Sequence, residues 1–461
     1  MPLPGAMTAD PAAAPLAVIV LAAGQGTRMK SDTHKVLHPI AGKAMLLHLL
    51  DTVTDLSPTR EIVVVGKGRE QVEAAVTSRG VVLALQAEQL GTAHAVGAAV
   101  PALGDFDGNV LILFGDTPFV AVDTLRAMLA RLGASDAPGI VVLTHSPAEP
   151  GAYGRVILGD GDRIATMVEY KDASDAERAV RLCNSGMMTL TAADLRNWLQ
   201  RIGNDNASGE YYLPDLVMVA AQDGRVSVAV EGAPVEAIGI NSRTELAAAE
   251  RLWQDRQRAK MMAAGVTLID PASVFFAADT QIARDVTIEP NVVFGPGVTI
   301  AQGTTIRAFS HIEGATIGAN CEVGPYARLR PGAVLEETAK VGNFVEIKQA
   351  RLGRGAKANH LAYLGDADVG AGANVGAGTI TCNYDGFFKY RTVIGDGAFI
   401  GSNSALVAPV TIGAGAIIGA GSVVTKDVEA DALGVTRSEQ QSLPGWAARF
   451  RARQKARKGA K

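Results

Sequence analysis

An aliphatic residue recurs at every sixth position through most of the C-terminal half of this chain. Three runs keep the phase: Ile282 to Ile312, Ile317 to Ile347 and Ile394 to Val424. A helix cannot place positions six apart on one face, because they lie far apart around a turn of 3.6 residues. A strand that bends after every six residues can. Self-similarity at this spacing is typical of a parallel β-helix, a solenoid with one narrow, continuous core.

Composition excludes several classes of protein. Hydrophobic residues are 48% and charged residues 20% of the chain, which is ordinary for a globular protein. The net charge of −4 implies no general affinity for nucleic acid or an anionic membrane, and no apolar run approaches the ~20 residues that insert across a bilayer. Three cysteines without a CxxC spacing indicate a reducing compartment. No basic residue precedes Arg28, so the start does not resemble a signal peptide, and we expect a cytoplasmic protein.

Apolar runs alternate with helical patterns in the first half of the chain. Alternation of this kind predicts a parallel α/β sheet that is covered on both faces. The expected strands are Leu16–Ala22, Glu61–Val65, Val110–Phe114 and Gly139–Leu143, and expected helices include Leu46–Leu56 and Thr124–Arg131.

A capping box, Ser242 with Glu245, opens a segment that lacks glycine and proline as far as Met262. Its Ala-, Arg- and Gln-rich composition predicts an exposed connecting helix. The expected organisation is therefore a disordered extension over 1–15, an α/β domain over 16–241, a linker helix over 242–264, the solenoid over 265–445 and a solvated, disordered basic tail over 446–461.

A glycine-containing loop, Leu21-Ala-Ala-Gly-Gln-Gly-Thr-Arg-Met29, follows the first expected strand. Its glycines can bring backbone N–H groups close to a phosphate at a strand–loop–helix junction. Met29 stands where a dinucleotide fingerprint needs glycine, and no Lys-Ser/Thr pair follows as in a Walker A loop. Arg28 and Lys35 instead supply two cations, which suit a polyphosphate on which charge develops during reaction.

This string resembles the signature of the sugar-1-phosphate nucleotidyltransferases. In that family, the positions of Asp116 and Asn241 hold Mg²⁺, an ion that prefers oxygen ligands. Phe114 is a departure, since some relatives carry Tyr there. The resemblance assigns Gln86, Gly91 and Thr92 to uracil and Gly154, Glu169 and Asn184 to the sugar. The full set of expected contacts with UTP or the UDP-sugar is Leu21, Ala22, Ala23, Gly24, Lys35, Gln86, Gly91, Thr92, Gly154, Glu169, Asn184 and Asn241.

Such a reaction needs no general base. A sugar phosphate is already anionic and can attack the α-phosphorus of a nucleoside triphosphate directly. The protein has to align and neutralise two anions, and we expect Arg28, Lys35 and the metal ion to do so.

Two cations occupy equivalent positions in the solenoid if three hexapeptides make one turn. Arg330 and Lys348 are then stacked neighbours, and each follows an inward aliphatic residue, so both face outward. Stacked cations repel unless an anion lies between them, although two unrelated solvated side chains are an equal alternative.

The hexapeptide phase is lost twice, between Ile347 and Val369 and between Val375 and Ile394. Irregular coils often form loops that line binding faces. His360 lies in the first break, close in sequence to the cation pair, and is a candidate base near neutral pH.

The stretch Arg328–Gly386 closely resembles the acetyltransferase half of the bifunctional N-acetylglucosamine-1-phosphate uridyltransferase/glucosamine-1-phosphate N-acetyltransferase family. The resemblance implies a left-handed β-helix that forms homotrimers with acyl sites at subunit interfaces, and His360 as the base that deprotonates the amine. The implied contacts are Arg330, Lys348, Tyr363 and Asn374 for glucosamine-1-phosphate, and Ala377, Asn383, Tyr384, Ser402, Ala420 and Arg437 for acetyl-coenzyme A, with Asn383 and Tyr384 also beside the sugar.

Together the motifs predict a Rossmann-like α/β nucleotidyltransferase domain followed by a left-handed parallel β-helix. The predicted enzyme acetylates glucosamine-1-phosphate from acetyl-coenzyme A, then couples the product to UTP with Mg²⁺ to make UDP-N-acetylglucosamine for peptidoglycan and lipopolysaccharide. One alternative is a single-activity nucleotidyltransferase with a structural or regulatory solenoid, against which His360 and the cation pair argue. Another is a scaffold or sugar sensor with a dead N-terminal site, against which the intact Arg28, Lys35, Asp116 and Asn241 argue.

Overall fold

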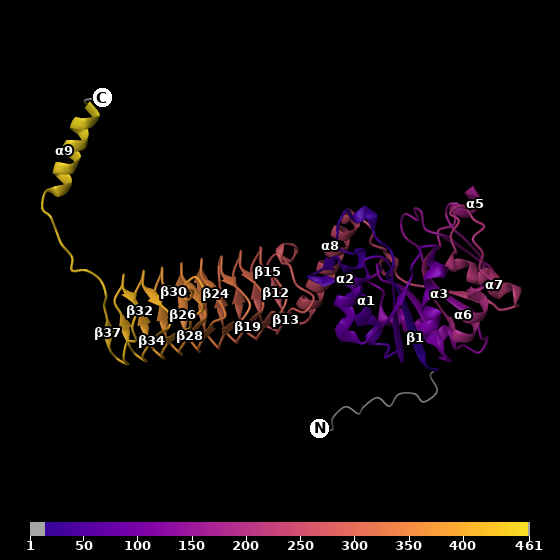
Figure 1. Cartoon of the computed structure of the whole chain (residues 1–461), viewed down its shortest axis with the longest axis horizontal. Helices are drawn as coiled ribbons and strands as arrows, with labels where there is room; N and C mark the ends of the chain where they lie inside the picture. Colours follow the sequence, from indigo (N-terminus) through magenta and orange to yellow (C-terminus); the bar gives the residue numbers. More distant parts are fainter. Residues whose placement is uncertain (1–13, 460–461) are drawn as a thin grey trace, which may run out of the picture. The chain divides into compact units, whose positions relative to one another are not determined.

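The computed structural model describes residues 14–459, which form an α/β unit and a β-helix (Figure 1). The first unit ends at Trp253 and the second begins at Gln254, so the division falls inside one long helix. The extension expected over 1–15 lies outside the described residues except for Ala14 and Pro15.

The first unit is built on a sheet with the strand order β11-β7-β10-β6-β1-β4-β5. Strand β10 runs antiparallel to both of its neighbours, so the expectation of an all-parallel sheet was wrong. The reason is that an antiparallel pair, β8 with β9, follows β7 where a parallel sheet needs a crossover helix. The strands are β1 (Leu16–Leu21), β4 (Arg60–Val65), β5 (Val82–Leu85), β6 (Asn109–Phe114), β7 (Ile140–His145), β8 (Arg155–Leu158), β9 (Ile164–Val168), β10 (Cys183–Thr191) and β11 (Ser227–Glu231).

Helices cover both faces of this sheet because its strands are apolar on both sides. In β1, Ile19 and Leu21 enter one apolar cluster while Val18 and Val20 enter the other. One face is covered by α1 (Met45–Thr54), α2 (Arg69–Val76) and α4 (Val122–Leu132), and the other by α3 (Thr92–Leu103), α6 (Ala192–Leu199) and α7 (Leu216–Gln222). Three short elements belong neither to this sheet nor to the helices that cover it: β2 (Pro39–Ile40), β3 (Lys43–Ala44) and α5 (Asp175–Arg178).

Helix α8 (Arg243–Ala263) was expected to be exposed, and this is wrong for one face of its second half, where Gln254, Arg258 and Met261 are buried. The amide of Gln254 donates to the carbonyl of Phe276 at 2.7 Å and accepts from the same residue's N–H at 2.9 Å. The guanidinium of Arg258 donates to the carbonyl of Val274 at 2.9 Å. Both side chains are buried. The first coil of a solenoid has no coil beneath it, so its core and backbone groups need such a cover.

The second unit consists of three parallel sheets that form the faces of a left-handed β-helix (Figure 1). Sheet I comprises β12 (Thr267–Leu268), β14 (Thr287–Ile288), β17 (Thr305–Ile306), β20 (Glu322–Val323), β23 (Lys340–Asn343), β26 (Lys357–His360), β29 (Asn374–Val375), β32 (Phe399–Ile400), β35 (Ile417–Ile418) and β37 (Leu433–Gly434). Sheet II comprises β15 (Val293–Phe294), β18 (His311–Ile312), β21 (Arg328–Leu329), β24 (Glu346–Lys348), β27 (Tyr363–Gly365), β30 (Ile380–Cys382), β33 (Ala405–Val407) and β36 (Val423–Val424). Sheet III comprises β13 (Gln281–Ile282), β16 (Thr299–Ile300), β19 (Ala315–Ile317), β22 (Ala333–Leu335), β25 (Arg351–Leu352), β28 (Ala367–Val369), β31 (Thr392–Ile394) and β34 (Val410–Ile412).

The hexapeptide prediction is confirmed, because every aliphatic residue of the three runs is buried except Ile282. Ile288 lies opposite Ile306 in the next coil, which corresponds to three hexapeptides per turn. The first loss of phase reflects coils that are one residue short, since Ile347 lies opposite Leu364 and Tyr363 opposite Ile380, and the second reflects one lengthened coil. In the lengthened coil, Val375 lies opposite Ile400, and the extra residues form a loop between β30 and β31.

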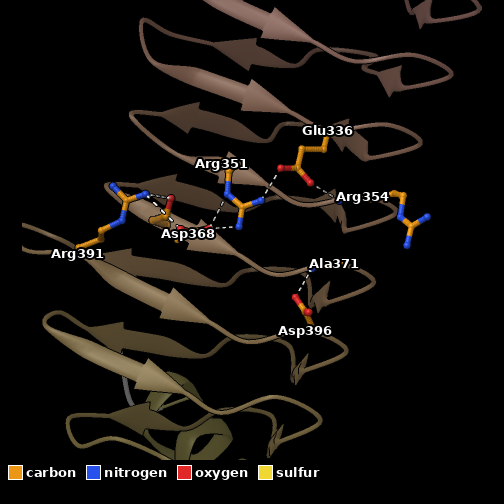
Figure 2. A network of polar contacts seen from close by, with 8 residues as sticks. Glu336, Arg351, Arg354, Asp368, Ala371, Arg391 and Asp396 are labelled. Carbon is orange, nitrogen blue, oxygen red and sulfur yellow. Dashed lines mark hydrogen bonds and ion pairs between the residues drawn. The ribbon is translucent and has the colours of Figure 1, made fainter.

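Alternating charges stack across successive coils on the outside of the solenoid (Figure 2). Arg351 lies between Glu336, at 2.6 Å, and Asp368, at 2.8 Å, and Arg391 approaches the far side of Asp368. These groups are partly exposed, so each pair contributes little by itself. Their alternation does avoid the repulsion of like charges in directly opposed positions.

The basic tail is not irregular, as was expected, but forms helix α9 (Trp446–Gly459) with exposed side chains. Its Ala, Arg, Lys and Gln residues are strong helix formers, and the rings of Trp446 and Phe450 stack one turn apart with centroids 5.2 Å apart. Among residues 14–459, no helix combines the length and apolarity needed to cross a membrane.

Candidate active sites

A cavity of about 260 Å³ opens at the carboxyl ends of β1 and β6. These strands pair in parallel with Leu21 opposite Phe114, so the glycine loop and Asp116 leave the sheet at the same edge. The cavity is lined by Leu21, Ala22, Ala23, Gly24, Lys35, Val36, Gln86, Gln89, Gly91, Thr92, Ala95, Phe114, Asp116 and Glu210. Most of the residues expected to contact UTP therefore meet in one place.

Gln89 is a member of this cavity that the sequence analysis missed. Its side-chain amide donates to the carbonyl of Ala23 at 2.8 Å and so holds the glycine loop. Nothing in the local pattern distinguishes Gln89 from an ordinary polar loop residue, since its partner lies far away in the sequence.

The ammonium of Lys35 joins the two residues that were expected to hold a metal ion. It lies 2.5 Å from Oδ2 of Asp116 and 2.9 Å from Oδ1 of Asn241. Two oxygen atoms from separate loops thus converge on one cation, which is the donor chemistry that Mg²⁺ requires. Among the described residues, no three His, Cys, Asp or Glu side chains gather at one point, so substrate phosphates and water would have to complete the coordination of such an ion.

The N-terminus of α8 holds Asn241 in place. The carboxylate of Glu245 accepts the backbone N–H of Asn241 at 2.6 Å, while the N–H of Glu245 donates to Oγ of Ser242 at 3.3 Å. The expected capping box is therefore modified, since the glutamate reaches one residue beyond the cap. The N-terminus of α8 thus orients Asn241, whose side-chain amide oxygen accepts the hydrogen bond from Lys35.

The residues expected at the uracil surround the start of α3. Gly91 has a φ of +118°, and a Cβ there would lie 2.5 Å from the carbonyl oxygen of Tyr211, so only glycine fits. The side-chain amide of Gln86 donates to the carbonyl of Gly91 at 3.2 Å and lies 3.1 Å from Nδ1 of His94. The positive end of the α3 dipole lies beside the cavity, and the N–H of Ala93 in its first turn donates to the carbonyl of Tyr211 at 2.9 Å.

Gly154, Glu169 and Asn184, which were expected at the sugar, form a second group. The N–H of Asn184 donates to the carbonyl of Gly154 at 2.9 Å, and a Cβ on Gly154 would lie 3.3 Å from the Glu169 carboxylate. Burial raises the pKa of Glu169, and the nearby carboxylate of Asp215 raises it further. This group does not line the 260 Å³ cavity.

Arg28 is not brought into the site. It lies on an exposed turn, Thr27–Met29, and within the described part of the chain it makes no hydrogen bond or ion pair. Arg28 thus does not line the cavity, and its joint action with Lys35 on bound phosphates stays a prediction.

In the solenoid, Arg330 and Lys348 lie on neighbouring coils at the end of sheet II, and a third cation joins them. The close approach of the ammonium of Lys389, and then the charge of Arg330, lower the pKa of Lys348. Arg330 also pairs with Glu346 at 2.8 Å. The sequence analysis missed Lys389, because the loop that returns it to this place lies outside the hexapeptide pattern.

His360 is the last residue of β26 in sheet I and lies on the exposed edge where the chain turns into sheet II. Its Nδ1 is 2.7 Å from Oδ1 of Asn343, the residue opposite it in the preceding coil. Tyr363 follows in sheet II, opposite Glu346, so it lies between His360 and the cations. Asn374 lies instead on sheet I, opposite Lys357.

Three of the positions expected at acetyl-coenzyme A share the edge between sheets I and II. Ala377, Ser402 and Ala420 each follow a strand of sheet I in successive coils above His360, and Arg437 donates to the carbonyl of Ala420 at 2.5 Å. Asn383 and Tyr384 lie in the loop after β30, where the amide of Asn383 donates to Asp366 at 2.5 Å.

Comparison with known proteins agrees with both halves of this architecture. A family model described as "MobA-like NTP transferase domain" matches residues 18–267. A second, "Bacterial transferase hexapeptide (six repeats)", matches residues 279–314 and 391–426. The fold and sites thus define a two-domain transferase, with a nucleotidyltransferase domain and a hexapeptide-repeat domain.

Full-length relatives identify the family. "Bifunctional protein GlmU" of Sphingopyxis alaskensis is 64% identical over 97% of this chain and 98% of its own length. The protein of the same name from Zymomonas mobilis is 54% identical over 96% of this chain and 98% of its own length. The chain belongs to the bifunctional GlmU family, whose members make UDP-N-acetylglucosamine. The predicted family, fold class and bifunctional activity are confirmed, and the single-activity alternative is not favoured.

Proposed function

We propose that the cavity beside β1 and β6 transfers a uridylyl group from UTP to N-acetylglucosamine-1-phosphate with release of pyrophosphate. The observation that carries this assignment is that Asp116, Asn241 and Lys35 converge at the cavity that the glycine loop lines. Asp116 and Asn241 would hold Mg²⁺, which supplies Lewis-acid stabilisation of phosphate charge when bound. Lys35 neutralises the phosphates, and the rigid loop and α3 terminus orient them for attack.

We propose that the face of sheet II carries acetyl transfer. The cations at its far side bind the phosphate of glucosamine-1-phosphate, which places the amine near His360. An amide oxygen can only accept a hydrogen bond, so the contact with Asn343 puts the proton of neutral His360 on Nδ1 and leaves a lone pair on Nε2. Nε2 takes the amine proton as nitrogen attacks the thioester carbonyl, and the coenzyme A thiolate leaves.

The same family resemblance also implies an oligomeric state, a cellular location and the domain bounds. We propose that the solenoids associate as a homotrimer in the cytoplasm, with acetyl sites between subunits, and that the domains divide at 241 and 264. The solvent-facing position of His360 supports this arrangement, because residues 14–459 of one chain leave this side chain exposed.

One incubation tests both activities. The full-length protein is mixed with glucosamine-1-phosphate, acetyl-coenzyme A, UTP and Mg²⁺, and each product is scored separately. We expect free coenzyme A, pyrophosphate and UDP-N-acetylglucosamine. Release of pyrophosphate only when N-acetylglucosamine-1-phosphate is supplied would contradict the acetyl-transfer assignment.

A further inference from the structure

The part of the chain between the glycine loop and β2 carries Lys35. This Lys35 segment, residues 29–38, contains no α-helix or β-strand, and residues 30–33 in its middle are exposed. The ammonium of Lys35 nevertheless has a defined place, because it contacts both Asp116 and Asn241. An irregular surface segment needs contacts with the rest of the fold to keep one conformation.

The side chain of Gln71, in α2, makes two of these contacts. Its NH₂ group donates to the carbonyl of Asp32 at 2.9 Å, and its Oε1 accepts the N–H of His34 at 2.9 Å. The amide thus uses its donor end and its acceptor end on the two sides of one residue, just before Lys35. Helix α2 is itself fixed to the sheet, since Val72 is buried in one of the two apolar clusters.

Arg243, the first residue of α8, contacts the two ends of the same segment. Its Nε donates to the carbonyl of Met29 at 3.2 Å, and its Nη1 lies 3.3 Å from Nδ1 of His38. A guanidinium can only donate, so Nδ1 accepts this hydrogen bond. Burial and the charge of Arg243 lower the pKa of His38, which keeps the imidazole neutral. A cation in the first turn opposes the helix dipole, so α8 itself gives no reason for an arginine here.

The start of α8 therefore holds both partners in the contact between Lys35 and Asn241. Glu245 accepts the backbone N–H of Asn241, while Arg243 holds the segment that carries Lys35. The stem of Lys35 also lies against the glycine loop, since a Cβ on Gly26 would lie 2.5 Å from the Cβ of Lys35. These contacts select one place for a long side chain that has many rotamers.

We propose that Gln71 and Arg243 are positioning residues for uridylyl transfer, which hold the Lys35 segment so that its ammonium stays at the proposed metal site. The inference rests on the uridylyl transfer proposed above, in which Lys35 neutralises the phosphates. Neither side chain lines the 260 Å³ cavity, so each acts through Lys35. A displacement of about 1 Å can lower a rate roughly 10²-fold, so a loosened segment is expected to slow the reaction.

The test measures uridylyl transfer by full-length Gln71→Ala and Arg243→Ala. We expect kcat/KM to fall about 10- to 100-fold in each, while acetyl transfer is unchanged and the first unit still melts cooperatively. The same changes in a Lys35→Ala background should lower the rate by less than about 2-fold, since no ammonium is left to misplace. Arg251→Ala, an exposed arginine of the same helix, is the matched control and should keep the parental rate.

Hydrogen exchange supplies a measurement that does not depend on activity. Peptides that cover residues 29–38 should exchange faster in both variants. In Gln71→Ala the N–H of His34 loses its acceptor, and in Arg243→Ala both ends of the segment lose a contact. Peptides from β1 and β6 should exchange at the parental rate.

Three results would overturn the inference. The first is exchange of the segment at the parental rate in both variants, and the second is faster exchange with a parental uridylyl rate. The third is an equal loss of rate with and without the Lys35 ammonium, which would mean that the two side chains do not act through it. If the parental protein releases no pyrophosphate from UTP and N-acetylglucosamine-1-phosphate, the proposed uridylyl transfer has failed instead, and hydrogen exchange still decides whether these side chains hold the segment.

Discussion

Asn343 Oδ1 lies 2.7 Å from His360 Nδ1, across one coil of the solenoid. The two residues face each other because β23 and β26 pair in parallel register. The hydrogen bond selects one tautomer of the imidazole and directs Nε2 away from the protein. The imidazole that we propose as the base therefore has its lone pair on Nε2 before any substrate binds.

We expect His360→Ala to lower acetyl transfer by roughly 10²- to 10⁴-fold, the usual scale for general base catalysis, without changing uridylyl transfer. Asn343→Ala should cause a smaller loss, because the imidazole remains but its tautomer and orientation are no longer selected. Both activities are measured separately on each variant, together with the pH profile of acetyl transfer. An alanine variant at 360 with the parental rate and profile would mean that the base is another group.

Lys348→Ala should behave differently from His360→Ala. Its ammonium is proposed to contact a phosphate in both the ground state and the transition state, so its loss should mainly raise KM for glucosamine-1-phosphate. Steady-state kinetics with varied glucosamine-1-phosphate checks this. Lys340→Ala, a lysine on sheet I paired with Glu322, is a suitable control and should leave KM unchanged. A fall in kcat at constant KM would place Lys348 in the chemical step.

Chelation should separate the two reactions. EDTA is expected to abolish uridylyl transfer and spare acetyl transfer. The proposed metal ligands Asp116 and Asn241 belong to the first unit, whereas the residues proposed for acetyl transfer belong to the second. Asp116→Asn should raise the Mg²⁺ concentration needed for half-maximal uridylyl transfer, since it removes the one anionic oxygen of the pair. Loss of both activities in EDTA, or of neither, would disagree with this assignment.

The fragment 1–264 should retain uridylyl transfer. Each unit has its own core, and the residues at the uridylyl site all precede Trp253. Turnover of UTP with N-acetylglucosamine-1-phosphate is the measurement. A fragment that folds, as judged by its circular dichroism and cooperative melting, but turns over nothing would contradict separability.

Gln254→Ala should destabilise the solenoid. It leaves the N–H and carbonyl of Phe276 buried without their partner, at a cost of about 1–3 kcal/mol for each group. We expect the melting transition of the second unit to fall and that of the first to stay. Gln257→Ala, in the same helix but only half-buried, should have little effect. If the second unit melts at the same temperature in both variants, the hydrogen bonds from Gln254 to Phe276 are not needed for its stability.

Glu169→Gln should raise stability at neutral pH. Burial raises the pKa of Glu169, so the folded chain binds this proton more tightly than the unfolded chain does. The free energy of unfolding therefore falls as pH rises from the ordinary pKa of 4.5 through the raised value. The Glu169→Gln variant has no carboxyl group at this position, so its free energy of unfolding does not fall in this way. Its gain in Tm should be present at pH 7 to 8 and absent near pH 4, and the exposed Glu149→Gln serves as control.

The sequence by itself determined the solenoid and much of the nucleotide site. The six-residue period requires a bending strand wherever it occurs, and the glycine loop follows β1 directly, so both depend on neighbouring residues alone. The run from Leu21 to Gly24 could thus be placed in a binding cavity without knowledge of the fold, and the structure shows that it lines one.

Only the tertiary structure decided which distant residues meet. Lys389 reaches Lys348, and Asn343 meets His360, because coils of unequal length stack in register. Gln254 is buried because the solenoid's first coil lies over it. Contacts between segments far apart along the chain depend on the path of the backbone, and local periodicity carries no information about that path.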